Sequence, residues 1–178
     1  ASFVAINGEY AKDNNKVYWD TEIIQRADPN TFVYLGNLYA KDKYKVFWRE
    51  REIKGADPNS FQIIDGPNLW SRDRKDFYFG ERPVAVMDLA SFKIIKNNWA
   101  RDKTAYYAVP QFATIVKMDC DYPSMRILSE EYALDKNRAY YEGIPIEGAD
   151  VKSFHVTGTI TAKDKFQKYR GKSVDWLK

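Results

Sequence analysis

The chain has 178 residues, of which 44% are hydrophobic, 16% are aromatic and 30% are charged, and its formal net charge is +3. This length suffices for one domain with a core of its own. Because basic and acidic residues are interleaved throughout, the sequence has no charged tail of the kind that binds nucleic acid or a membrane surface, and it has no apolar run long enough to cross a bilayer.

The chain offers few clues to its compartment. Cys120 is the only cysteine, so an internal disulfide bond is excluded. The sequence begins at Ala1 without a signal-peptide pattern, which is compatible with a removed signal, lipid-anchored segment or tag. We expect a periplasmic or cell-envelope protein rather than a cytoplasmic one.

One aspartate recurs six times, at intervals of 29 to 33 residues. An aromatic residue follows it by five positions, a small residue precedes it by two, and a Phe or Met lies ten or twelve positions upstream. The aspartates are Asp13, Asp42, Asp73, Asp102, Asp135 and Asp164, and the aromatic residues are Tyr18, Phe47, Tyr78, Tyr107, Tyr140 and Tyr169. This pattern predicts six tandem units, at approximately 2–30, 31–59, 60–90, 91–123, 124–152 and 153–178, within one β-repeat domain spanning 1–178.

Each unit is predicted to contain three strands. In the second unit, the apolar run 32–35 is short and β-prone, 39–41 forms a second strand, and a third strand contains Phe47. Asp42 lies between the second and third strands, where a carboxylate accepts hydrogen bonds from the backbone N–H groups ahead of it. We therefore interpret the six recurring aspartates as turn formers.

A second aspartate motif closes each of the first five units. Asp28 and Asp57 precede Pro-Asn and then Thr or Ser, a pattern typical of a capped single helical turn. Asp88, Asp121 and Asp150 occupy the same place in the later units. These residues are predicted to be structural as well.

The fourth unit departs most from the pattern, because it gains residues between Tyr107 and Met125. Insertions in repeat proteins usually form loops on one face, often the binding face. The candidate partner-binding residues are Pro110, Gln111, Phe112 and Tyr122.

The recurring rings allow two interpretations. In the favoured one, the rings of the Tyr18 column join the units, each stacking on its counterpart in the next unit. In the other, the residues that follow them alternate to the outer face and form an aromatic platform of Trp19, Trp48 and Tyr141. Ala108 and Arg170 interrupt this stripe.

The residues with reactive side chains point to no catalytic, metal-binding or cofactor-binding site. His155 is the only histidine and is predicted to face solvent. Cys120 falls in a column of small apolar residues, which predicts a packed, inert thiol. Glu130 and Glu131 are adjacent, so on a strand their carboxylates would face opposite ways, unlike a glycosidase pair. No phosphate-binding glycine loop or nucleophile elbow occurs.

Two segments resemble a known bacterial repeat. The run Asp135-Lys136-Asn137-Arg138-Ala139-Tyr140-Tyr141 with the following Gly143 and 146–154, and the segment 54–61, are similar to the repeat of the DKNYY family. The resemblance extends over nearly the whole chain and weakens in the third and fourth units. It implies a bacterial tandem-repeat protein and supplies no catalytic or ligand residues.

The sequence therefore predicts an all-β fold of six three-stranded units in an elongated or curved array, with a small β-propeller as the alternative. The expected function is non-catalytic protein binding by a monomer, for instance as an immunity or inhibitor protein that neutralises a secreted bacterial toxin. The alternative is a cell-envelope carbohydrate-binding module that uses exposed aromatic rings. Neither binding of nucleic acid nor insertion into a membrane is expected.

Overall fold

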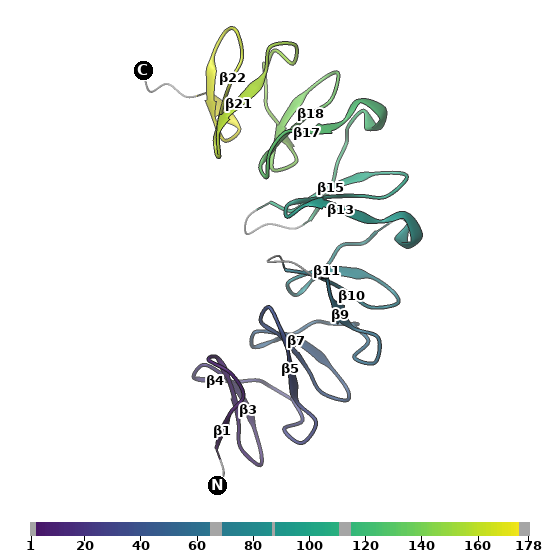
Figure 1. Cartoon of the computed structure of the whole chain (residues 1–178), viewed down its shortest axis with the longest axis vertical. Coiled ribbons are helices and arrows are strands. Elements are labelled where there is room, and N and C mark those ends of the chain that lie inside the picture. Colours follow the sequence, from purple (N-terminus) through teal and green to yellow (C-terminus); the bar gives the residue numbers. More distant parts are fainter. Residues whose placement is uncertain (1–2, 65–68, 87, 111–114, 175–178) are drawn as a thin grey trace. The chain divides into compact units, whose positions relative to one another are not determined.

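The computed structural model describes residues 3–64, 69–86, 88–110 and 115–174 (Figure 1). These residues form short strands in six four-stranded antiparallel sheets, together with two 3-10 helices. Neither of these helices is long and apolar enough to span a membrane. The chain divides into two compact units, residues 1–86 and 87–178, and each is described by itself.

The first unit contains three sheets, one for each repeat. The first sheet consists of β1 (Val4–Ala5), β2 (Tyr10–Lys12), β3 (Val17–Trp19) and β4 (Glu22–Ile23). The second consists of β5 (Val33–Gly36), β6 (Tyr39–Lys41), β7 (Val46–Trp48) and β8 (Arg51–Glu52). The third consists of β9 (Gln62–Ile63), β10 (Trp70–Arg72), β11 (Phe77–Phe79) and β12 (Arg82–Pro83). Each sheet is a simple meander, in which each strand pairs with the strand that follows it in the sequence.

The second unit repeats this plan. Its first sheet consists of β13 (Lys93–Lys96), β14 (Trp99–Arg101), β15 (Tyr106–Ala108) and β16 (Val116–Lys117). The next consists of β17 (Arg126–Ile127), β18 (Tyr132–Leu134), β19 (Ala139–Tyr141) and β20 (Ile144–Pro145). The last consists of β21 (His155–Gly158), β22 (Thr161–Lys163), β23 (Lys168–Arg170) and β24 (Ser173–Val174). The helices η1 (Leu89–Ser91) and η2 (Tyr122–Ser124) precede the first two of these sheets.

The all-β prediction is confirmed, but the prediction of three strands per repeat is wrong, because each sheet has four. The missed strand is only two residues long in every repeat, which is too short to show an alternation of polar and apolar side chains. In the first repeat, β4 follows a two-residue turn in which Asp20 has a φ of 51°. Such tight turns usually contain Asn-Gly or Asp-Gly, which this turn lacks.

Aromatic rings join the repeats, although not in the predicted pairing. Phe32, which opens the second repeat, packs on Phe47 of its own repeat with ring centroids 5.8 Å apart, and on Tyr10 of the first repeat at 5.5 Å. Phe154 joins Tyr132 and Tyr169 in the same way. None of the ring contacts found among the described residues joins a ring of the Tyr18 column to its counterpart in the next unit. Phe32 and Phe154 each contact rings of two successive repeats.

Candidate functional site

The recurring aspartate holds two repeats together. Oδ1 of Asp135 accepts the backbone N–H groups of Asn137 and Arg138, each at 2.7 Å, which closes the turn between β18 and β19. Oδ2 accepts the hydroxyl of Tyr140 at 2.7 Å and the backbone N–H of Asp121, at the end of the preceding repeat, at 2.7 Å. The turn-forming role predicted for these aspartates is confirmed, and the bond to the preceding repeat adds a second role.

The residue after the buried aspartate completes this connection. Lys136 forms an ion pair with Asp121 at 2.8 Å, and its backbone N–H donates to the Ser124 hydroxyl at 3.0 Å. Asp121 in turn accepts the Ser124 hydroxyl, which confirms its predicted role as a cap of η2. We call this arrangement the junction clamp. Three of its connections recur at the other junctions: the backbone N–H of the capping aspartate donates to the buried aspartate, the following cation pairs with the capping aspartate, and the backbone N–H of that cation donates to a Ser or Thr hydroxyl. The buried aspartate, the cation and the capping aspartate are Asp42, Lys43 and Asp28; Asp73, Arg74 and Asp57; Asp102, Lys103 and Asp88; and Asp164, Lys165 and Asp150.

The clamp favours the ionised carboxylate. Burial by itself raises the pKa of Asp102, but the hydroxyl groups of Thr104 and Tyr107 and two backbone N–H groups outweigh it, so the pKa lies far below its ordinary value. At Asp164 the same balance, with Tyr169 as the hydroxyl donor, brings the pKa to about 2. A carboxylate that already accepts this many hydrogen bonds is a poor proton donor or acceptor near neutral pH.

The other groups with reactive side chains are His155, Cys120, Glu130 and Glu131. His155 is exposed, as predicted, and its Nδ1 lies 2.9 Å from the Ser153 carbonyl oxygen. Cys120 packs beside a core cluster, where burial and the nearby Asp135 carboxylate raise the pKa of its thiol to about 11. Glu130 and Glu131 lie in the turn between β17 and β18 rather than on a strand. In the described part of the chain, no group of three or more His, Cys, Asp or Glu side chains could hold a metal ion.

The three rings of the predicted aromatic platform are half-buried. Trp19 packs edge-on against Tyr10 at 4.7 Å, and Tyr141 against Tyr132 at 5.1 Å, each across its own hairpin. The indole N–H of Trp48 is buried without a hydrogen-bond partner among the described residues.

Glycines of the following repeat cover part of two of these rings. Gly80 lies over Trp48 and Gly171 over Tyr141, so that a Cβ added to either glycine would be 3.5 Å from the ring. One side of each ring therefore supports the next repeat.

The predicted partner-binding residues are only partly placed. Gln111 and Phe112 lie outside the described residues. Pro110 is buried. Tyr122 is half-buried; its ring packs on Tyr106 at 5.0 Å, and its hydroxyl donates to the Asp102 carbonyl at 2.7 Å and accepts from Arg101 at 3.3 Å. Tyr122 therefore positions Arg101 and Tyr106.

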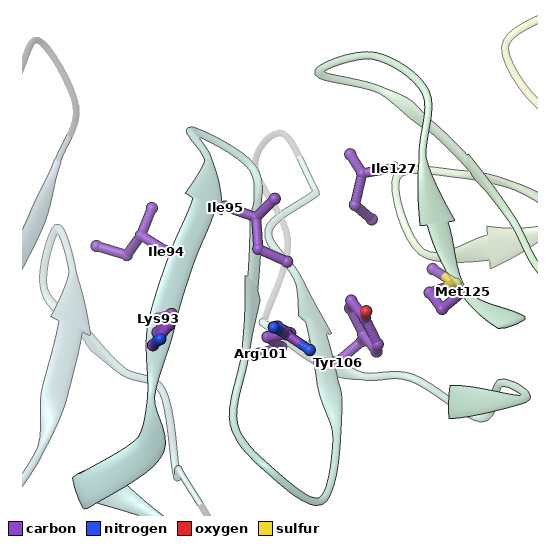
Figure 2. A pocket seen from close by; sticks show the side chains of 7 residues that line it. All are labelled: Lys93, Ile94, Ile95, Arg101, Tyr106, Met125 and Ile127. Carbon is purple, nitrogen blue, oxygen red and sulfur yellow. The ribbon is translucent and has the colours of Figure 1, made fainter. Parts of the chain in front are cut away.

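Arg101 and Tyr106 line an open groove of about 420 Å³ between the fourth and fifth repeats, both within the second unit. The lining also includes Lys93, Ile94 and Ile95 of β13, Met125 after η2, and Ile127 of β17. Figure 2 shows Ile95 and Ile127 on facing sides of the groove, with Arg101 and Tyr106 below and between them. We call this feature the fourth-repeat groove.

The groove contains an unusual pair of charges. Lys93 and Arg101 are direct cross-strand neighbours on β13 and β14. In the described part of the chain, neither forms an ion pair with a carboxylate. Like charges opposite one another destabilise a sheet, so the position of these two cations is not explained by the stability of the sheet. Among the described residues that line the groove, none is Asp, Glu or His.

Sequence reasoning missed this groove, although it identified the neighbouring Tyr122. The sequence did contain a signal, which is the combined charge of two positions in each repeat. One position follows the upstream Phe or Met, and the other precedes the recurring Asp. In the other repeats these pairs are Val4 and Lys12, Val33 and Lys41, Gln62 and Arg72, Arg126 and Leu134, and His155 and Lys163. Only the fourth repeat combines two Lys or Arg side chains, but the strand register was needed to show that they are neighbours.

The repeated meanders and their junction clamps define a tandem β-repeat protein. The chain belongs to the DKNYY family, which matches residues 1–51 and 39–173. The resemblance noted in the sequence is thereby confirmed, and the clamp gives it a physical meaning, since Asp135, Lys136 and Tyr140 of the motif each form one of its contacts. No curated protein and no solved structure matches the chain.

Proposed function

We propose that this chain is a non-catalytic protein-binding repeat protein, and that it acts as an immunity or inhibitor protein against a secreted bacterial toxin. The observation that carries the proposal is that recurring residues and variable residues occupy different places in the structure. Those that recur between repeats are engaged in clamps and ring contacts, whereas residues that differ between repeats gather at the fourth-repeat groove. A scaffold with one specialised binding surface requires such a separation of structural residues from variable residues.

The composition of the groove supports a protein partner. Ile95 is 39% exposed and lies near the half-buried Ile127, beside the aromatic ring of Tyr106 and the cations Lys93 and Arg101. Protein interfaces combine apolar and aromatic centres with arginine and a polar rim. A rigid framework under such a surface reduces the entropy lost on binding.

We also propose that the six sheets form one open array, elongated or curved, rather than a small propeller. Each junction clamp joins a repeat only to its neighbour, and repeats of about 30 residues are short for a propeller blade. Small-angle scattering tests this, because a closed ring would give a markedly smaller radius of gyration than an open array.

A carbohydrate-binding module remains the second candidate, because Trp19, Trp48 and Tyr141 keep part of their surface exposed. Their packing against neighbouring rings and glycines gives this candidate less support than the groove gives to protein binding. Quenching of tryptophan fluorescence by cell-wall fragments would favour it.

The decisive experiment is affinity capture with the immobilised chain from cells of the producing bacterium. We expect one specific protein, retained by the wild type and by the control Ile144→Asp, but lost with Ile95→Asp and Ile127→Asp. Ile144 is a suitable control because it is also 39% exposed and does not line the groove. Capture that is indifferent to both groove variants would contradict the use of this site.

The toxin-neutralising role needs a separate test. Expression of the captured protein should arrest growth of a host cell, and co-expression of this chain should restore it. A captured protein without toxicity would leave protein binding intact and exclude the immunity role.

A further inference from the structure

We infer that the fourth-repeat groove recognises a segment of the partner protein in which a carboxylate side chain lies next to an apolar one. The carboxylate binds between Lys93 and Arg101, and the apolar side chain packs between Ile95 and Ile127. This inference rests on the proposed protein-binding function and names the chemistry of its partner.

The two positive charges of Lys93 and Arg101 favour a bound anion. Lys93 and Arg101 are cross-strand neighbours, and such neighbours have Cβ atoms about 5 Å apart. One carboxylate can accept hydrogen bonds from both and remove their repulsion, whereas water only screens it. In the first three repeats the residue equivalent to Arg101 has an uncharged cross-strand neighbour, since Lys12 lies opposite Val4, Lys41 opposite Val33 and Arg72 opposite Gln62.

The remaining lining selects for an apolar neighbour of that carboxylate. Ile127 and Met125 form one side, Ile95 the other, and Tyr106 lies between them. At the position of Tyr106 the other repeats have Val17, Val46, Phe77, Ala139 and Lys168, so only the fourth repeat presents a phenol hydroxyl there. This hydroxyl provides one further donor for the carboxylate.

The shape of the groove favours a chain segment over an enclosed small molecule. The groove is open to solvent along one side, and about 420 Å³ is small among pockets that enclose a ligand. A protein segment can place one acidic and one apolar side chain in such a groove while its backbone stays outside.

The test uses a library of random twelve-residue peptides displayed on phage, selected against the immobilised full-length chain. We expect enriched peptides to combine Asp or Glu with Leu, Ile or Phe one or two positions away. Their binding should fall at least tenfold with Lys93→Gln/Arg101→Gln. It should be unchanged with the matched double variant Arg72→Gln/Lys163→Gln, which removes the same charge from equivalent positions in the third and sixth repeats.

Arg101 also contacts Tyr122, so the exposed single variant Lys93→Gln serves as a second test that leaves this contact in place. It should weaken the selected peptides about three- to tenfold, and weaken them less as salt concentration rises. Failure to enrich any peptide, enrichment without an acidic residue, or equal binding to both double variants would overturn the inference. Octanoate that binds the wild type but not Lys93→Gln/Arg101→Gln, without any enriched peptide, would assign the groove to a free amphiphile and also overturn it.

The outcome is separable from the proposed function. If cells yield a partner whose binding depends on Ile95 but not on Lys93 and Arg101, the chain is a protein-binding protein and the charge-based recognition is wrong. If acidic peptides bind as described and cells yield no partner, the groove chemistry stands and the function does not.

Discussion

The buried aspartate of each junction clamp receives donors from two consecutive repeats. Asp135 is fully buried and accepts two backbone N–H groups of its own turn, one hydroxyl and one N–H of the preceding repeat. A carboxylate can accept all four, because each oxygen offers two lone pairs. No other side chain of similar size has this capacity, which explains why the position is always Asp in this chain.

Asp135→Asn should therefore lower the free energy of unfolding by about 3 kcal/mol, because the amide group can accept on one side only and opposes two donors on the other. Urea denaturation followed by tryptophan fluorescence measures this change. The control is Asp119→Asn, whose side chain is 95% exposed and which should shift stability by less than about 1 kcal/mol. Similar effects of both substitutions would contradict the clamp.

The clamps also predict how acid unfolds the protein. The pKa of Asp164 is lowered to about 2 and that of Asp102 is lowered further, from unfolded-state values near 4. Groups with a depressed pKa in the folded state contribute stability above the unfolded pKa and lose it as the pH falls through the folded one. The urea midpoint should thus be nearly constant from pH 7 to 5 and fall between about pH 4 and 2. In Asp164→Asn this fall should be shallower, and an unchanged profile would contradict the assignment.

Strands and turns were predictable to different degrees. The repeats, the turns at Asp13 and its equivalents and the single-turn caps follow from local hydrogen-bonding chemistry, which a sequence pattern carries. The two-residue fourth strand is too short for a periodic signal. Neither the pairing of Phe32 with Tyr10 nor the groove could be deduced, because periodicity identifies columns of residues but not which columns meet across a junction.

The junction of the fourth and fifth repeats shows how one small residue changes the contact between elements. Ala108 ends β15 where the second and fifth repeats have Trp48 and Tyr141, and the turn after β19 approaches it closely. Gly143 in that turn has a φ of +81°, and a Cβ added there would lie 2.5 Å from the Ala108 Cβ. A glycine is therefore required at this position for both its conformation and the available space.

Gly143→Ala should destabilise the protein by about 2–4 kcal/mol through this overlap and the left-handed backbone. Ala108→Gly should recover the steric part in the double variant, leaving the conformational cost of about 1 kcal/mol and a small loss from a glycine in β15. Urea denaturation of both single variants and the double variant gives the coupling energy. Strictly additive effects would show that the two residues do not touch.

For the whole molecule, the important property is that sheet pairing is sequential and that each junction clamp joins neighbouring repeats. The open array proposed above predicts that the stability of the protein is a sum of repeat terms and nearest-neighbour terms. A substitution at one junction should consequently lower the local stability most in the two repeats that it joins. The loss should be smaller in more distant repeats, because every intervening junction has a stability of its own.

Hydrogen exchange in Asp135→Asn tests this property directly. The substitution breaks the clamp between the fourth and fifth repeats, so amides of β14, β15, β18 and β19 should lose protection equivalent to most of the measured destabilisation. Amides of β2, β3, β6 and β7 belong to the other compact unit and lie two or three repeats before the fourth repeat in the sequence, so their protection should stay within about 0.5 kcal/mol of the wild type. An equal loss across all six sheets would instead mean that residues 1–178 unfold as the single cooperative domain expected from the sequence, and the nearest-neighbour description would have to be abandoned.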